Sequence, residues 1–151
     1  MIAISVLALT AIIAVLVLYT GPFSRSGEAI ANVTVYKSPT CGCCSKWVDH
    51  LEDNGFNVIV KNQYDVSPMK RQLAVPEPLR ACHTATVGDY VIEGHVPATD
   101  IIRLLNDKPS IRGLAVAGMP QGSPGMETGR LDRYSVMSFN EQGVTRTYNT
   151  Y

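Results

Sequence analysis

The chain has 151 residues, 46% of them hydrophobic, with 13 basic and 13 acidic side chains and a formal net charge of zero. A chain of this length and apolar content builds one ordinary hydrophobic core, so we expect a single folded domain. The balanced charge and the lack of any block of Lys or Arg exclude a protein that binds nucleic acid by electrostatic attraction.

The N-terminal segment is strongly apolar. Residues 1–20 contain no charged side chain and only Ser5, Thr10 and the final Thr20 as clearly polar ones, and a helix of this length can cross a bilayer. A retained transmembrane anchor and a cleaved signal peptide are both open, although no Lys or Arg precedes the apolar run as in a standard signal peptide. Residues 21–31, rich in Gly, Ser and Ala, predict a flexible tether, and residues 32–151 the folded domain.

A predicted strand and a predicted helix flank a cysteine-rich motif. Residues 33–36 alternate apolar and polar side chains as a strand does, and the turn-forming residues 38–40 end it. Apolar side chains then recur three and four positions apart, which predicts a helix with one buried face that ends near Asn54-Gly55. The predicted buried stripe consists of Cys41, Cys44, Trp47, Val48 and Leu51.

The rest of the chain predicts further strands and helices in a defined order. They are a strand at 58–60, a helix from Ser67 (N-cap) and Pro68 to about Leu73, a hairpin of 84–87 and 90–92, and a helix opened by Pro97 whose buried side is Ile101, Ile102, Leu104 and Leu105. Residues 111–130 predict a loop, and 134–139 with 144–148 an added hairpin. With right-handed crossovers, this order predicts an α/β fold, a mixed four-stranded sheet covered by helices, which is typical of thioredoxin-like proteins.

Three of the four cysteines lie in the run Cys41-Gly42-Cys43-Cys44. The C-x-x-C pair, Cys41 and Cys44, suits reversible disulfide chemistry at a helix start, where the backbone N–H groups and the helix dipole favour a thiolate. A third thiolate at Cys43 adds charge repulsion unless a soft cation such as Cu(I) or Zn(II) neutralises it. In a regular helix Cys41 and Cys44 share one face and Cys43 is rotated about 100° away from Cys44, so helical geometry does not let all three bind one ion.

Other uses of the cysteines remain open. The four thiols could instead form two structural disulfides, for instance Cys41–Cys44 and Cys43–Cys82, if the protein lies in an oxidising compartment. A thiol-disulfide oxidoreductase would use Cys41 as nucleophile and Cys44 as resolving thiol, and a structural zinc site would unfold on chelation. We favour metal binding because the adjacent Cys43 and Cys44 are poorly placed to close useful disulfide loops.

The segment Lys37-Ser-Pro-Thr-Cys41-Gly-Cys43-Cys44-Ser-Lys-Trp47 resembles the CopG-like copper-resistance family, periplasmic metal-binding proteins long catalogued as a domain of unknown function. The resemblance covers roughly Val33 to Tyr148. It continues through three further blocks, Ala81-Cys-His-Thr-Ala85, Glu93-Gly-His-Val-Pro-Ala98 and Gly118-Met-Pro-Gln-Gly-Ser-Pro-Gly-Met-Glu127.

The resemblance implies a thioredoxin-like domain in the bacterial envelope that binds copper through its cysteines and helps cells withstand excess metal. It implies a periplasmic location, either exported or anchored to the inner membrane by residues 1–20, with copper ions and other envelope copper-handling proteins as partners. The basic residues that follow the apolar run, Arg25 and Lys37, by themselves favour a cytoplasmic domain.

The same resemblance places Cys82 near the motif. In thioredoxin-like proteins a cis-proline before the third strand faces the C-x-x-C pair, and Cys82-His83 occupies that place here. The expected copper ligands are Cys41, Cys43, Cys44 and Cys82, with His83, Met119 and Met126 as further candidates. Because one sulfur can bridge two Cu(I) ions, the site has the capacity for more than one copper, and its dithiol could couple copper redox change to disulfide formation.

Several candidate ligands also have ordinary structural interpretations. His83 could be a polar loop residue, and His95 could cap the third helix or bond to backbone. His50 is expected to be solvated on the outer side of the first helix, and Trp47 to be core. Met119 and Met126 flank a Gly-Pro loop that could close over the cysteines, although methionine more often fills gaps in a core.

Overall fold

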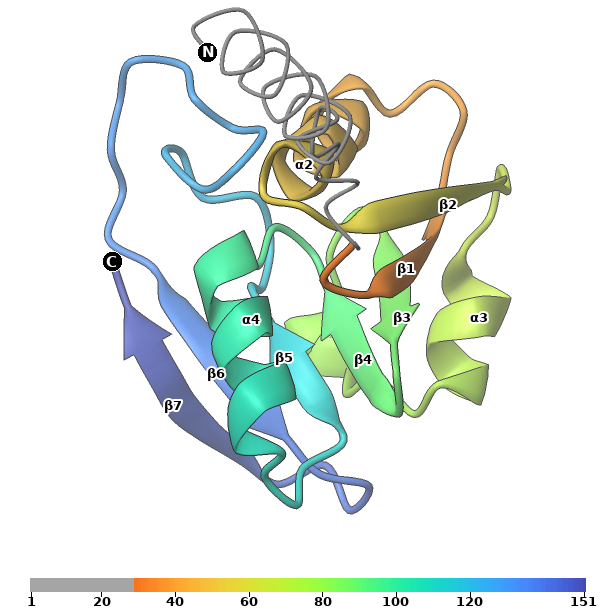
Figure 1. The fold of residues 1–151 in the computed structure, drawn as a ribbon, viewed down its shortest axis with the longest axis vertical. Helices are drawn as coiled ribbons and strands as arrows, with labels where there is room; N and C mark the ends of the chain where they lie inside the picture. The colour runs from red at the N-terminus through yellow and green to blue at the C-terminus, as the bar shows by residue number, and fades with distance from the viewer. Residues whose placement is uncertain (1–28) are drawn as a thin grey trace, which may run out of the picture.

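The computed structural model describes residues 29–151, which form one mixed β-sheet with helices packed on it (Figure 1). Its strands are β1 (Asn32–Lys37), β2 (Asn57–Asn62), β3 (Thr84–Val87), β4 (Tyr90–Glu93), β5 (Gly113–Ala115), β6 (Ser135–Phe139) and β7 (Thr145–Thr150), in the sheet order β2-β1-β3-β4-β5-β6-β7. The expected apolar helix of residues 1–20 and most of the expected tether lie outside the described residues. Between residues 29 and 151, no helix has the length and apolar character needed to span a bilayer.

The strands predicted from the sequence form one continuous part of the sheet. β1 runs parallel to β2 and antiparallel to β3, and β3 and β4 form the predicted hairpin. The prediction of a four-stranded sheet was wrong, because the described residues form seven strands. β5 lies in the segment predicted as a loop and pairs with β4, and the C-terminal hairpin of β6 and β7 pairs with β5 and so extends the same sheet. A three-residue strand shows no periodicity, so only its pairing partners reveal it.

The helices agree closely with the sequence pattern. They are α2 (Gly42–Asp53), α3 (Ser67–Gln72) and α4 (Ala98–Asp107), with a 3-10 turn at Glu77–Leu79. The buried side of α2 consists of Cys44, Trp47, Val48 and Leu51, as predicted, whereas Cys41, the fifth residue of the predicted stripe, is the partly exposed N-cap. At α3 the N-cap residue is Val66, not Ser67, and Ser67 N–H instead donates to Asp65 Oδ1 at 2.9 Å.

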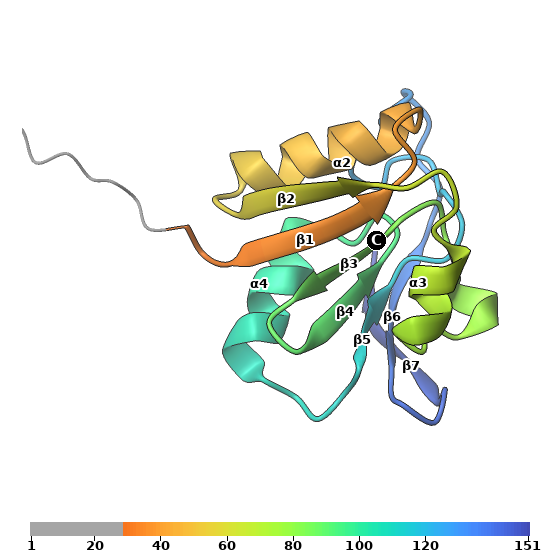
Figure 2. The ribbon, with the colours of Figure 1, turned by 90° about the vertical axis from the view of Figure 1, so that its right-hand side faces the viewer.

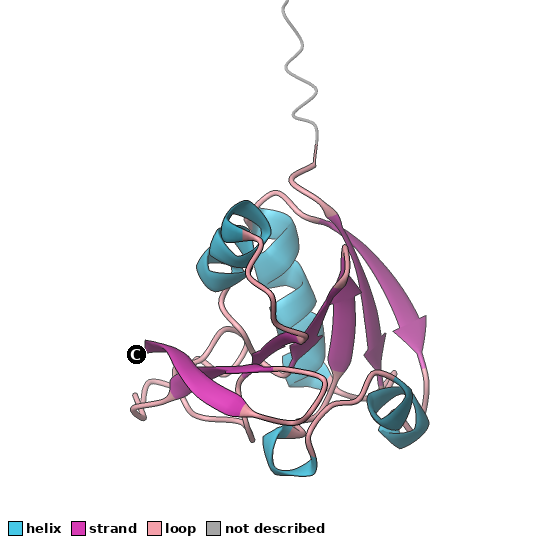
Figure 3. Cartoon of the chain, turned by 90° about the horizontal axis from the view of Figure 1, so that it is seen from below, coloured by secondary structure: helices cyan, strands magenta, loops and turns pink. Residues whose placement is uncertain are grey.

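Helices α2 and α4 lie on one side of the sheet and α3 on the other (Figures 2 and 3). The buried apolar residues form two clusters. One cluster joins α2 and α4 to the sheet, with Trp47, Leu51, Ile101 and Leu104 among its fully buried side chains. The smaller cluster, which includes Leu79 and Val91, lies on the other face of the sheet with α3 and the 3-10 turn. In β4 and β5 successive residues alternate between the clusters, because successive side chains of a strand point to opposite faces: Ile92 and Leu114 belong to the larger cluster, Val91 and Ala115 to the smaller one.

His50 is not the solvated residue that the sequence predicted. Its ring is partly buried, and His50 Nε2 accepts the backbone N–H of Ala98 at 3.1 Å. Ala98 is the first residue of α4, whose leading N–H groups have no partner within the helix, and its N-cap residue, Pro97, supplies no side-chain hydrogen bond. His50 therefore links α2 to the start of α4, the helix for which the sequence offered His95 as a candidate cap.

Candidate metal centre

The first turn of α2 carries three sulfur atoms. Cys41 is the N-cap residue with extended backbone angles, φ −79° and ψ 97°, so it lies outside the regular helix. This departure brings Cys41 Sγ within 3.5 Å of Cys43 Sγ, which regular helical geometry does not allow. Cys44 is fully buried, while Cys41 and Cys43 are partly exposed.

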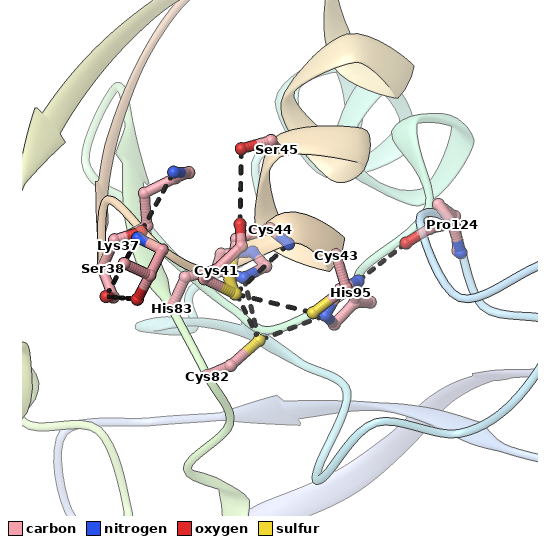
Figure 4. Close-up of a disulfide and its surroundings, with 11 residues drawn as sticks. Lys37, Ser38, Cys41, Cys43, Cys44, Ser45, Cys82, His83, His95 and Pro124 are labelled. Carbon is pink, nitrogen blue, oxygen red and sulfur yellow. Dashed lines mark hydrogen bonds between the residues drawn. A yellow bond between two sulfur atoms is a disulfide. The ribbon is translucent and has the colours of Figure 1, made fainter.

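The fourth sulfur belongs to Cys82, in the segment just before β3, which is the neighbour of β1 in the sheet. Because β3 runs antiparallel to β1 with Tyr36 opposite Thr84, the residues just before β3 lie beside those just after β1. Cys82 Sγ is 3.4 Å from Cys44 Sγ, and all four sulfur atoms lie within 4.8 Å of one another (Figure 4). The structure therefore places Cys82 where its position before the third strand predicts.

Two of the four cysteines are joined. Cys41 and Cys44 form a disulfide, whereas Cys43 and Cys82 are free thiols. Of the two structural disulfides considered from the sequence, the Cys43–Cys82 bond is not formed. Since the disulfide joins the C-x-x-C pair at the start of a helix, its reduction would add two thiols beside the two that are already free.

Sequence reasoning gave no firm ligand role to His95, yet its ring faces the sulfur cluster. His95 Nε2 is 3.2 Å from Cys82 Sγ, and His83 Nδ1 is 3.4 Å from the same sulfur, so these three residues form a second group of potential ligands. The predicted hairpin of β3 and β4 could have indicated that His95 lies near Cys82. In the structure Thr84 pairs with Glu93, and Gly94 N–H donates to His83 O. Residues just after β4 must therefore lie beside those just before β3.

Hydrogen bonding fixes the tautomer of His95. His95 Nδ1 is 2.7 Å from the carbonyl oxygen of Pro124, and a carbonyl only accepts, so Nδ1 carries the proton and donates. Nε2 then presents its lone pair to the Cys82 thiol. A histidine held this way by a carbonyl is the usual arrangement of a metal ligand.

The loop that contains Pro124 packs directly on the first turn of α2. Gly125 has φ +84°, and a Cβ atom there would lie 2.6 Å from Cys43 O and 2.9 Å from Trp47 N, so only glycine fits. Met126 is partly buried beside this contact, whereas the Met119 side chain is 52% exposed. The loop covers the cysteine turn, and the ligand role of its methionines stays a prediction.

Comparison with known proteins agrees with this geometry. Residues 79–126 match the family described as "Protein of unknown function, DUF411". Two solved structures, "Copper resistance protein copG- Form 2" and its Form 1, are each 41% identical over 80% of this chain and cover 98% and 97% of their own chains, with TM-scores of 0.77 and 0.76. This chain belongs to the CopG-like copper-resistance family. No protein with curated annotation matches it.

Within this CopG-like chain, the segment that matches the family model supplies one half of the candidate centre. It contains Cys82, His83, His95 and the Gly125 loop, whereas the three cysteines of α2 precede it. The two halves meet only in the folded chain, because β1 and β3 are neighbours in the sheet.

A buried ion pair supports the Cys82 loop of the CopG-like domain. Lys70 Nζ lies 2.6 Å from Glu93 Oε1, with side-chain exposures of 4% and 0%. The same carboxylate oxygen accepts the backbone N–H of Ala81, directly before Cys82, at 2.6 Å. The pair therefore joins α3 and β4 to the loop that carries the fourth sulfur.

Burial sets the protonation of the groups at the centre. Burial first, and next the neighbouring Cys43, raise the pKa of the Cys82 thiol to about 12. Burial, aided by the nearby His95, lowers the pKa of His83 well below 6.5, and burial also lowers the pKa of His95. The metal-free centre thus keeps a neutral thiol at Cys82 between two neutral imidazoles.

The histidine shifts predict that metal-free protein loses stability on mild acidification. Below pH 6.5 His83 and His95 take up protons in the unfolded chain but stay neutral in the folded chain, because their folded pKa values are lower. Proton uptake therefore stabilises the unfolded state relative to the folded one until the pH reaches each folded pKa. The free energy of unfolding should fall by up to about 1.4 kcal/mol per pH unit for each histidine. Urea unfolding in chelator between about pH 7.5 and 5.5 measures this slope, which the raised pKa of buried Glu93 opposes.

A His83→Gln variant is the matched test of this pH dependence. Glutamine does not titrate, so its stability should depend less on pH over the same range. A parent protein whose stability is constant over this range would contradict the assigned neutral state of the buried rings.

Proposed function

We propose that this chain binds Cu(I) through Cys41, Cys43, Cys44 and Cys82 and serves in copper resistance or homeostasis. The observation that supports the proposal most directly is the approach of all four sulfur atoms to within 4.8 Å of one another. Thiolates favour Cu(I), and the two similar solved structures are copper resistance proteins by their descriptions. Zinc is the less favoured metal for the same sulfur ligands.

Each part of the cluster has a distinct role in this proposal. Cys43 and Cys82 are free thiols, and reduction of the Cys41–Cys44 disulfide supplies the other two. Bridging sulfurs could hold more than one Cu(I), and binding would release the thiol protons, including that of Cys82. His95 Nε2 and His83 Nδ1 adjoin Cys82 as nitrogen donors, and the thioethers of Met119 and Met126 are further candidate ligands.

The proposal includes a thioredoxin-like core with coupled redox chemistry. The β2-β1-β3-β4 order and a C-x-x-C disulfide at the start of α2 support it. Two electrons from the Cys41 and Cys44 thiolates would reduce two Cu(II) ions to Cu(I) as the disulfide forms. In this scheme the same residues bind copper and change its oxidation state.

The proposed location is the periplasm, with the domain either exported or anchored to the inner membrane through residues 1–20. The disulfide supports an oxidising compartment, and other envelope copper-handling proteins are the proposed partners. Protease added to intact spheroplasts should digest the domain, and a protected domain would contradict this location.

A thiol-disulfide oxidoreductase is the second candidate, because the Cys41–Cys44 disulfide is the oxidised form such an enzyme would have. Cys41 would be the nucleophile and Cys44 the resolving thiol. Metal binding would then be incidental. Cys43 is the residue that separates the two candidates, since it has no role in a two-thiol redox centre.

Titration of the reduced, metal-free chain with Cu(I) tests the proposal. Copper uptake should produce thiolate-to-copper charge-transfer absorption and compete with a Cu(I) chelator, and zinc should bind more weakly. Cys43→Ser should lower the copper stoichiometry and leave insulin reduction nearly unchanged. No copper uptake together with rapid insulin reduction would favour the oxidoreductase.

A further inference from the structure

Each sulfur of the disulfide faces one of the two free thiols. Cys43 Sγ lies 3.5 Å from Cys41 Sγ, and Cys82 Sγ lies 3.4 Å from Cys44 Sγ (Figure 4). Disulfides rearrange when a thiolate attacks one sulfur of the bond and displaces the other. Both free thiols are therefore adjacent to a bond that they could attack.

Cys44 can be reached only from inside the protein. Its side chain is fully buried under α2, so a thiol from solvent cannot approach its sulfur. Cys82 Sγ already touches it, from a loop that the Lys70–Glu93 pair holds in place through Ala81 N–H. The structure thus directs Cys82 towards this half of the disulfide.

The sulfur that would be displaced is the better leaving group. Cys41 caps α2, and its Sγ accepts the backbone N–H of Cys44 at 3.4 Å. Backbone N–H groups and the dipole at a helix N-terminus favour a thiolate, and a more stable thiolate leaves faster. Attack at Cys44 would therefore release the thiol that the helix stabilises.

Attack by Cys43 on Cys41 is disfavoured by the chain itself. The product would join residues two positions apart, so the disulfide would close only a very short loop, and short loops gain the least stability from a disulfide. Attack by Cys82 joins α2 to a separate segment 38 residues away and leaves the helix intact.

We propose that the Cys41–Cys44 disulfide isomerises to a Cys44–Cys82 disulfide. Hydroxide takes the proton of the Cys82 thiol and becomes water, the Cys82 sulfur bonds to Cys44 Sγ, and the Cys44–Cys41 bond breaks. Cys41 keeps the electron pair of that bond and takes up a proton from water, which restores the hydroxide. No electrons enter or leave the protein, so the exchange needs no external oxidant.

The exchange changes which thiols are free while the protein stays oxidised. Before it, the free pair is Cys43 and Cys82, on two segments, with His95 beside Cys82. After it, the free pair is Cys41 and Cys43, on one turn at the start of α2. If copper is the ligand, as proposed above, the move would transfer a bound Cu(I) from the mixed sulfur and histidine site to a two-sulfur site. That consequence rests on the proposed function, whereas the exchange itself does not.

Disulfide mapping of the metal-free, full-length chain tests the exchange. Reduced protein is oxidised with one equivalent of diamide, and samples are taken at once and after hours at mildly alkaline pH. Each sample is blocked with N-ethylmaleimide in urea at slightly acidic pH, so that buried thiols react, and is then cut with trypsin. Cleavage at Lys and Arg yields the fragments 38–46, with three cysteines, and 81–103, with Cys82 alone. The original disulfide lies within the first fragment, and the proposed one joins the two.

The expected result is a joined pair of fragments within a monomeric chain. Maleimide labelling of Cys82 should be lost to the same extent as labelling of Cys41 is gained. The Cys43→Ser variant should still produce the joined pair, because Cys82 attacks directly, and the Cys82→Ser variant should retain only the internal disulfide.

Two results would overturn the proposal. One is full labelling of Cys82 after the incubation, with the disulfide still inside fragment 38–46. The other is loss of the joined fragments in Cys43→Ser, which would make Cys43 the attacking thiol. Because the experiment contains no metal, its outcome is independent of whether the protein binds copper.

Discussion

Replacement of Cys82 by serine is expected to remove high-affinity Cu(I) binding. Cys82 supplies the one sulfur of the cluster that does not come from the α2 turn, and it contacts both Cys44 and His95. A serine hydroxyl is a hard donor that binds Cu(I) poorly. The loss of affinity should exceed the roughly 10–100-fold that typically follows removal of a residue that only supports a metal ligand. Competition of the reduced protein with a Cu(I) chelator measures it.

Lys46→Ala is the matched control for Cys82→Ser. Lys46 lies on the exposed side of α2, two residues from the cysteines, so its loss changes the charge near the site without removing a ligand. Its Cu(I) affinity should stay close to that of the parent. An unchanged affinity in Cys82→Ser itself would remove this sulfur from the proposed site.

Replacement of Lys70 by methionine is expected to cost about 3–5 kcal/mol of unfolding free energy, as is typical when one partner of a buried ion pair is removed. The Glu93 side chain is 0% exposed, and its Oε2 already has no hydrogen-bond partner among the described residues. Without Lys70 the carboxylate loses its counter-charge and keeps only the Ala81 N–H at Oε1. Urea unfolding of the metal-free protein at neutral pH measures the loss.

Arg71→Met is the control for this prediction. Arg71 follows Lys70 in α3 but is exposed, so its replacement should change stability by no more than about 0.5 kcal/mol. A second variant, Lys70→Met with Glu93→Leu, should recover much of the lost stability, because no buried charge remains. Equal destabilisation by Lys70→Met and Arg71→Met would show that the pair contributes little.

Local pattern was sufficient for the elements that present the motif. The alternation in β1, the stripe of α2 that includes Trp47, and the β3–β4 hairpin were all predicted from the sequence and are present. These features depend on residues within a few positions of each other along the chain, so the hydrophobic periods of 2 residues for strands and 3.6 for helices predict them. The family was likewise evident from four short blocks of sequence.

Only the tertiary structure decided which residues complete the centre and how the sheet ends. His95, His50 and the Lys70–Glu93 pair gain their roles from contacts between segments that are far apart in sequence, and β5 exists because β4 and β6 pair with it. The sequence alone placed the three cysteines at the start of a helix. Which side chains surround them depends on strand order, because neighbouring strands in the sheet bring distant residues within bonding distance, and no local period encodes that order.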